Sequence, residues 1–318
     1  MKEMEQYKEH KLAQEISRGI GRILYDVMPA DKRAKIEKTI ENHQLGVNAA
    51  LDEAGFQMHQ KNFDKALSIL ESLINKMEQG KGEMTLFRAD AVSEYFYFHN
   101  PFEELLYKEL YKPDKTLRRM TEDFGHCYYM YGNLLFELKR YEDAIVALKK
   151  AISINPVRVE AILELAEVYK IHKEWDEYLN LTKQCLDFAY TSRELARCYR
   201  NLGYYYIEQE EYRIATALYF KSMAYDNESA TPQSQLFYIQ QVSGNPTPDL
   251  SPDEVNVILK ENNIPQNAND AVLGISLVFG KGSFERVDYE SAKGFWSIFY
   301  DITKDEGIKK MIDSLPKQ

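Results

Sequence analysis

A pattern of aromatic, glycine and alanine residues occurs twice in the middle of the chain and limits the folds open to it. In both copies the glycine follows an aromatic residue by four positions and precedes an alanine by twelve: Tyr128, Gly132 and Ala144, then Tyr199, Gly203 and Ala215. The surrounding apolar residues recur at helical spacing, which indicates helices with one buried face. Small residues at fixed positions let two antiparallel helices cross closely, since a larger side chain would wedge them apart. The pattern therefore predicts stacked helix pairs.

A weaker copy lies between these two. Ala166 takes the place of the glycine, 34 residues after Gly132 and 37 residues before Gly203. Tyr178 stands where the second small residue is expected, and three extra residues fall around 186–192. We expect this unit to have an enlarged helix crossing or a longer second helix.

This spacing resembles the tetratricopeptide repeat (TPR) family, of bacterial type, whose unit of about 34 residues contains two helices and closes with a proline. Pro156, after Asn155, stands where one unit should end and the next begin. The resemblance covers about 100 residues, 124–227. It implies an all-α fold, in which antiparallel helix pairs form a right-handed superhelical solenoid with helical caps at both ends.

We expect the rest of the chain to be organised around this array. The expected parts are an N-terminal helical cap (1–44), a TPR-like solenoid (45–230), a short helix with a proline-rich linker (231–252), and a C-terminal helical segment with a degenerate repeat-like pair (253–318). The linker is predicted from three prolines between residues 243 and 252. The clear units of the solenoid are 125–158, 159–195 and 196–229.

Two outer pairs match the repeat less well. A degenerate unit over 48–80 lacks one residue of its turn when it is aligned from Gly55 to Ala66. Near the C-terminus, residues 268–279 are expected to form the first helix of another pair. Residues 280–283, with two glycines, are then expected to form the connection to the second helix.

Residues 84–123 do not match the repeat and are expected to be a helical insert, either a degenerate pair or a lid. We expect one helix over 84–98. Asn100 and Pro101, followed by two acidic residues, predict the start of a second helix. No stretch of the chain alternates apolar and polar residues for long enough to predict a sheet.

The charge balance argues against polyanionic partners. The chain has 40 Lys and Arg against 50 Asp and Glu, a formal net charge of −10, whereas nucleic-acid binding depends on cations that neutralise phosphates. No apolar window approaches the length of a membrane span, and the first residues contain no apolar targeting segment. We therefore expect a cytoplasmic protein with neither nucleic-acid nor membrane partners.

No catalytic motif is present. The sequence lacks phosphate-binding glycine motifs, HExxH and GxSxG, and its six histidines show no i, i+4 pairing. Cys127, Cys185 and Cys198 have no CxxC spacing, which argues against a disulfide framework and a cysteine-rich zinc site. Cys127 and Cys198 flank the aromatic position of a repeat, so we expect both to be buried core residues and not reactive thiols. We expect no enzyme activity, no cofactor and no metal.

The TPR resemblance implies a concave groove, lined by the first helix of each unit, that holds an extended or helical peptide. The positions carried over are His126, Tyr129, Asn133 and Phe136 in the first clear unit, Glu160, Leu163, Glu167 and Lys170 in the second, and Arg197, Arg200, Tyr204 and Ile207 in the third. Aromatic side chains, an amide and arginines suit peptide binding, although ordinary packing between repeats is the alternative explanation.

One class of peptide fits poorly. Family members that bind chaperones hold a C-terminal carboxylate with lysine, asparagine and arginine side chains. Of the matching positions here, Asn133 agrees and Arg197 agrees loosely, whereas Glu164 places a negative charge where an amide is expected. We predict that a chaperone tail is not the ligand.

The leading hypothesis is a non-catalytic scaffold or adaptor that binds a protein or peptide partner. The alternative is a peptide-responsive regulatory sensor similar to bacterial pheromone receptors, although residues 1–44 show no helix-turn-helix spacing. An enzyme with its site between the array and the C-terminal helices is a weaker alternative. Exposed ends of the array also leave a homo-oligomer open.

Overall fold

The computed structural model describes residues 29, 47–78, 93–120, 123–246 and 248–316 of the chain. The expected N-terminal cap, apart from Pro29, lies outside these residues, as do residues 84–92 of the insert. None of the helices described has the length and apolar character needed to span a lipid bilayer.

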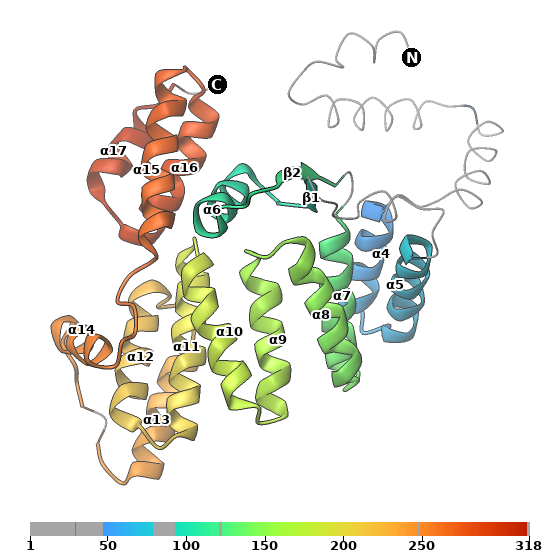
Figure 1. The fold of residues 1–318 in the computed structure, drawn as a ribbon. Helices are drawn as coiled ribbons and strands as arrows, with labels where there is room; N and C mark the ends of the chain where they lie inside the picture. The colour runs from blue at the N-terminus through green and yellow to red at the C-terminus, as the bar shows by residue number, and fades with distance from the viewer. Residues whose placement is uncertain (1–28, 30–46, 79–92, 121–122, 247, 317–318) are drawn as a thin grey trace.

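Helix pairs build the described part of the chain. Four consecutive pairs lie side by side in sequence order in Figure 1: α4 (Val47–His59) with α5 (Phe63–Glu78), α7 (Phe124–Glu137) with α8 (Tyr141–Ile154), α9 (Val159–Ile171) with α10 (Trp175–Phe188), and α11 (Ser192–Glu208) with α12 (Tyr212–Tyr225). Each pair contacts the next through α5 and α7, α8 and α9, and α10 and α11. The predicted all-α solenoid of helix pairs is therefore confirmed.

Further helices follow the array. α13 (Thr231–Ser243) and α14 (Pro252–Glu261) both contact α12, and a fifth pair in the described chain joins α15 (Asp270–Glu285) to α16 (Tyr289–Thr303). The last helix is α17 (Glu306–Asp313), which contacts α16.

All five described pairs share one turn. The residue in the left-handed conformation lies seven positions after the small residue of the first helix in every pair: Lys61, Lys139, Lys173, Glu210 and Val287. Two backbone bonds close each turn; in the α7–α8 pair, Lys139 N donates to Phe136 O (2.9 Å) and Arg140 N to Leu135 O (2.8 Å). This pair of bonds is the Schellman arrangement, which satisfies the last carbonyl groups of the first helix.

The glycine of the first helix contacts a large side chain sixteen residues later. A Cβ atom at Gly132 would lie 2.6 Å from Leu148 Cγ, and one at Gly203 would lie 2.9 Å from the ring of Tyr219. The C-terminal pair repeats the contact between Gly280 and Trp296. The glycines therefore leave room for the side chain that fills each helix crossing.

This regularity corrects the expectations for the two outer pairs. Helix α15 continues to Glu285, so residues 280–283 lie inside the helix and not in a connection. Gly280 precedes Ala292 by twelve positions, the same spacing as in the clear units, which the sequence analysis overlooked. In the first pair, Ala54 and Ala66 are also twelve apart and fully buried, so its turn lacks no residue.

In the α9–α10 pair, a large residue stands at the usual small position of the second helix, and a small residue stands at the usual large position. Tyr178 is fully buried, and Thr182, which is also fully buried, occupies the position of the large side chain in the other pairs. The Tyr178 hydroxyl donates to Asn201 O in the next pair (2.9 Å). Helix α10, the second helix of this pair, has 14 residues, like α8 and α12. The expectation of a longer second helix was therefore wrong. The extra residues lengthen the next helix instead, because α11 has 17 residues.

The insert is not wholly helical. β1 (Ser93–Phe96) and β2 (Thr116–Arg119) form a parallel two-stranded sheet, joined by α6 (Pro101–Tyr111). A helix over 93–98 and the absence of a sheet were therefore wrong expectations. The helix start at Asn100 is as expected, because its side chain accepts a hydrogen bond from Glu103 N (3.0 Å) and Pro101 occupies the first turn.

The insert covers the loops between repeats. Phe98, Phe102 and Leu106 are buried in one hydrophobic cluster with Val157 and Ala189, which lie in the α8–α9 and α10–α11 connections. Figure 1 shows α6 over the same ends of the helix pairs, between the array and the α15–α16 pair.

The C-terminal pair docks on the start of α11. Asp301 Oδ2 accepts a hydrogen bond from Ser192 N (2.7 Å), and the Ser192 hydroxyl donates to Asp301 O. The carboxylate lies at the N-terminus of α11, where unpaired backbone N–H groups favour a negative charge. Helix α15 also contacts α6, so the insert lies between the array and the last helices.

We predict that Gly132→Ala lowers the free energy of unfolding by about 1–2 kcal/mol, because the new methyl group overlaps Leu148 in the helix crossing. Urea denaturation followed by circular dichroism measures the change. Gly274→Ala is the control, since nothing lies within 4 Å of a Cβ atom at this helical position, and it should raise the free energy by about 1 kcal/mol. Additive effects of Gly132→Ala and Leu148→Ala would contradict the contact.

We also predict that Val287→Asn raises the free energy of unfolding by about 1 kcal/mol, because a β-branched residue is strained at positive φ and asparagine tolerates it. Val287 has φ of 65° and is 65% exposed, so the substitution removes little packing. Val278→Asn, a 67% exposed position within α15, is the control and should bring no gain. Equal effects of the two substitutions in thermal unfolding would rule out backbone strain at Val287.

Candidate peptide-binding groove

The predicted groove residues lie on α7, α9 and α11, the first helices of three successive pairs. Helix α9 contacts both α7 and α11 directly. Arg197 on α11 bonds Glu164 on α9 (2.8 Å), and Asn201 Nδ2 donates to Glu167 Oε1 (3.3 Å). The structure therefore brings the inner positions of neighbouring repeats within hydrogen-bond distance.

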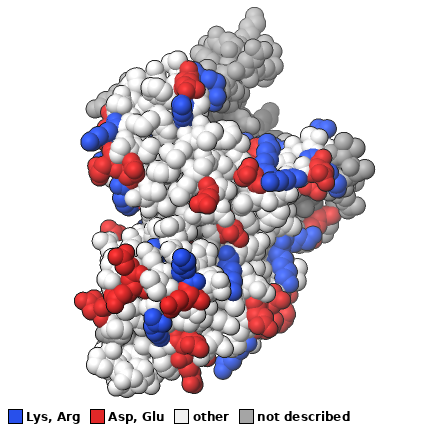
Figure 2. All heavy atoms as spheres, turned by 60° about the vertical axis from the view of Figure 1, so that its left-hand side comes forward, with Lys and Arg blue, Asp and Glu red and all other residues white. Residues whose placement is uncertain are grey.

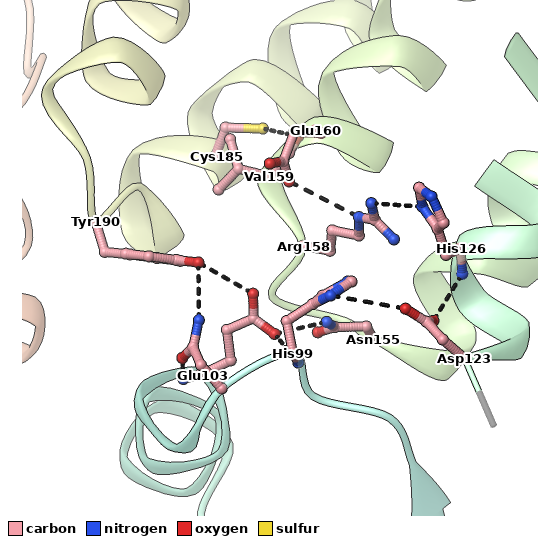
Figure 3. Close-up of polar contacts among 11 residues, drawn as sticks. His99, Glu103, Asp123, His126, Asn155, Arg158, Val159, Glu160, Cys185 and Tyr190 are labelled. Carbon is pink, nitrogen blue, oxygen red and sulfur yellow. Dashed lines mark hydrogen bonds and ion pairs between the residues drawn. The ribbon is translucent and has the colours of Figure 1, made fainter. Parts of the chain in front are cut away.

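A stack of three side chains occupies one end of this face. The Arg158 guanidinium lies 4.5 Å from the centroid of the Tyr129 ring, and the His126 ring stacks on Tyr129 with centroids 5.8 Å apart. Arg158 Nη2 lies 3.0 Å from His126 Nδ1, and Figure 3 shows the two side chains pointing toward each other. Burial and the neighbouring Arg158 lower the pKa of His126, so its neutral Nδ1 accepts the hydrogen bond from arginine.

Sequence analysis missed Arg158, which is only 8% exposed. Its Nε and Nη1 atoms are buried and have no hydrogen-bond partner among the described residues. The carboxylate paired with it is Glu160, 3.8 Å from Nε and half exposed. Arg158 lies in the connection before α9, outside the helical periodicity, so no spacing in the sequence indicates its burial.

Asn133 is one helical turn beyond Tyr129 on α7. Its side-chain oxygen is buried and finds no hydrogen-bond donor in the described part of the chain. Phe136, three residues further, is partly buried and packs edge-on against Tyr141, with centroids 5.7 Å apart. Tyr129, Asn133 and Phe136 are spaced i, i+4 and i+7, so they share one face of α7.

The charged groups further along the face are largely paired with each other. Lys170 bonds Glu167 on the same helix, and its Nζ lies 5.0 Å from the centroid of the Tyr204 ring on α11. Arg197 is held by Glu164, as described above. The cationic groups that could bind a ligand carboxylate are therefore already paired with glutamate side chains.

Three predicted groove residues lie elsewhere. Leu163 and Ile207 are buried in hydrophobic clusters, with 1% and 5% exposed, and cannot touch a ligand in the groove. Arg200 pairs with Asp226 (3.1 Å) at the end of α12, so it belongs to the packing of its own unit. The predicted groove residues that stay candidates are His126, Tyr129, Asn133, Phe136, Glu160, Glu167, Lys170, Arg197 and Tyr204.

A second polar cluster, also in Figure 3, fixes the insert. The buried Glu103 carboxylate accepts hydrogen bonds from His99 N (2.8 Å), Asn155 Nδ2 (2.8 Å) and the Tyr190 hydroxyl (3.2 Å). Asn155 and Tyr190 lie in two successive connections between repeats. With both of its oxygens bonded, this carboxylate connects α6 to the array.

The cysteines and acidic groups assemble no reactive centre in the described residues. Cys127 and Cys198 are buried, as expected, and Cys185 is buried as well. Burial raises the pKa of the Cys127 thiol to about 12, which keeps it protonated and poorly nucleophilic at neutral pH. Nowhere in these residues do three or more His, Cys, Asp or Glu side chains come together as metal ligands.

Comparison with known proteins gives three findings. The family model for the TPR repeat matches residues 132–170, from the middle of α7 to the end of α9. A curated relative, the Hsp70-Hsp90 organising protein of Plasmodium falciparum (isolate 3D7), is 27% identical over 104 residues, which are 31% of this chain and 18% of the relative. The match thus spans less than a fifth of that protein.

A solved structure described as YrrB, a TPR protein with an unusual peptide-binding site, is 16% identical, with a TM-score of 0.33. The alignment covers 68% of this chain and 99% of that chain. The segment matched by the repeat model lies in helix pairs that have the shared turn and a small residue at the helix crossing. Over α7, α8 and α9 this chain is therefore similar to the tetratricopeptide repeat family.

Proposed function

We propose that this protein is a non-catalytic adaptor that binds an extended peptide segment of another protein along α7, α9 and α11. The observation that carries the proposal is the buried side-chain oxygen of Asn133, which has no hydrogen-bond partner among the described residues and lies on the same face of α7 as Tyr129 and Phe136. An unpaired buried acceptor costs about 1–3 kcal/mol, which a ligand recovers when it supplies an N–H group. A peptide backbone supplies such a group at every residue other than proline.

The distribution of charge favours a protein partner over a nucleic acid. Figure 2 shows lysine, arginine and acidic side chains interspersed on the face drawn there, with no continuous basic strip among the described residues of that face. A phosphate backbone needs a clustered set of cations. The net charge of −10 also disfavours binding to a nucleic acid, because it repels the phosphate backbone.

The groove argues against a chaperone tail as its ligand. The curated relative is named for Hsp70 and Hsp90, but it shares only the matched segment with this chain. Here Glu164 bonds Arg197, which is the cation that would meet a terminal carboxylate. We propose that the bound segment is recognised by its backbone and apolar side chains and not by its terminus.

We predict that Asn133→Ala weakens peptide binding about tenfold, because it removes a buried hydrogen-bonding group worth about 1.4 kcal/mol. Peptides selected against the wild-type protein from a random display library serve as probes, with affinities measured by calorimetry. Tyr238→Ala, on α13 and 49% exposed, is the control and should leave the affinity unchanged. Unchanged affinity in Asn133→Ala, or no selectable peptide, would remove the basis of the proposal.

We further predict that a selected peptide binds equally well with a free and with an amidated C-terminus, because Arg197 is already paired with Glu164. Titration of both forms under the same salt conditions measures the difference. A loss of more than about tenfold on amidation would show a terminal carboxylate clamp instead. Compaction of the protein on peptide binding, seen in X-ray scattering, would favour the alternative of a peptide-responsive sensor.

A further inference from the structure

Among the described residues, one edge of the small sheet of the insert is covered and the other is not. On the side of β1 away from β2, Tyr97 N, just after the strand, donates to Ile154 O at the end of α8 (3.1 Å). On the far side of β2, Thr116, Arg118 and Arg119 are exposed. The edge of β2 is therefore the part of the sheet where another strand can reach.

The register shows which backbone groups point outward from β2. Phe96 pairs with Arg119, and Met120 N donates to Phe96 O (2.9 Å), so Met120 and Arg118 direct their backbone groups toward β1. Backbone groups alternate in direction along a strand, so those of Leu117 and Arg119 point away from β1. No hydrogen bond joins these outward groups to another residue in the described chain. An unpaired edge of this kind is a template for an added strand.

A cavity of about 190 Å³ is lined by residues of both strands and of the start of α6. Phe96, Phe98 and Leu117 give it an apolar wall, and Arg118 and Arg119 contribute cationic side chains. Its one carboxylate, Glu104, pairs with Lys108. A cavity of this size accepts an aliphatic side chain of a strand paired with β2, while main-chain bonds hold the strand itself.

The charge around the edge is opposite to that of the whole chain. Residues 112–119 contain four cations and one acidic residue, Asp114, whereas the protein has a net charge of −10. Lys115 pairs with Glu94 (3.6 Å), but Arg118 bonds only the Ser93 hydroxyl (2.9 Å) and Arg119 lies 5.2 Å from the centroid of the Tyr97 ring. Neither arginine forms an ion pair with a described carboxylate, so both are available to acidic side chains.

We propose that β2 is a second binding site, at which an extended acidic peptide of a partner protein adds as a third strand. The peptide pairs with the backbone of Leu117 and Arg119, places an apolar side chain in the cavity on the face of Leu117, and places its acidic side chains on the opposite face, beside Arg118. This site lies on the insert and not on α7, α9 and α11. It is independent of the groove proposed above.

The test uses an acetylated and amidated octapeptide in which valine and aspartate alternate, added to the full-length protein. We expect binding by fluorescence anisotropy, with slower hydrogen exchange at the amides of Leu117 and Arg119. The same peptide with lysine in place of aspartate should bind about tenfold more weakly, because its charge repels the arginines. Slow exchange at both amides before peptide is added would mean that the chain itself covers the edge, and would overturn the proposal.

Two variants locate the site. Leu117→Pro removes an outward N–H group and leaves the β1–β2 bonds in place, and Arg118→Gln with Arg119→Gln removes the charge without touching the backbone. Each should weaken binding of the valine–aspartate peptide about tenfold. Lys149→Gln with Lys150→Gln, an exposed pair on α8, is the charge-matched control and should leave it unchanged. Absence of binding to the wild type, or equal binding to the double arginine variant, would refute the site.

Asn133→Ala separates this site from the groove. It should leave binding of the valine–aspartate peptide unchanged, because Asn133 lies on α7 and contributes nothing to the β2 edge. A parallel loss in Asn133→Ala would show that the peptide binds in the groove, and would overturn the second site while leaving the groove proposal intact.

Discussion

The close approach of two antiparallel helices at a small residue determines the rest of this structure. In three of the described pairs a glycine of the first helix faces a large side chain sixteen residues later. Glycine occurs with Leu148, Tyr219 or Trp296. Ala166 occurs with Thr182, because Tyr178 fills the same crossing from one turn earlier. Since packed interiors tolerate little change in volume, the exchange keeps the pairs similar in spite of different sequences.

The sequence predicted the helix pairs well because each pair has a periodic apolar face and a fixed spacing of small residues. The helix start at Asn100 was predictable for a local reason, since an asparagine followed by proline and acids satisfies the first backbone N–H groups. The strands were not predictable. Each has four residues, too few to show a two-residue alternation, and they form only where the insert packs on the array.

The groove was predictable only in part. Helical spacing identified the face with Tyr129, Asn133 and Phe136, but a helix inside a solenoid is buried on several sides. Leu163 and Ile207 therefore share the spacing of the groove residues and lie in the core. Arg158 lies between helices, where no periodicity applies, and its burial against Tyr129 depends on the packing of two units.

The contact between α6 and the C-terminal pair changes how the molecule should unfold. In an ordinary array each repeat touches only its neighbours, so stability is a sum of local terms and the ends can open separately. Here the bond between Ser192 and Asp301 spans 109 positions, and that between Glu103 and Tyr190 spans 87. These links close large loops, whose entropy cost is repaid only when both partners are folded. The insert, the middle repeats and the last helices should consequently melt as one cooperative unit.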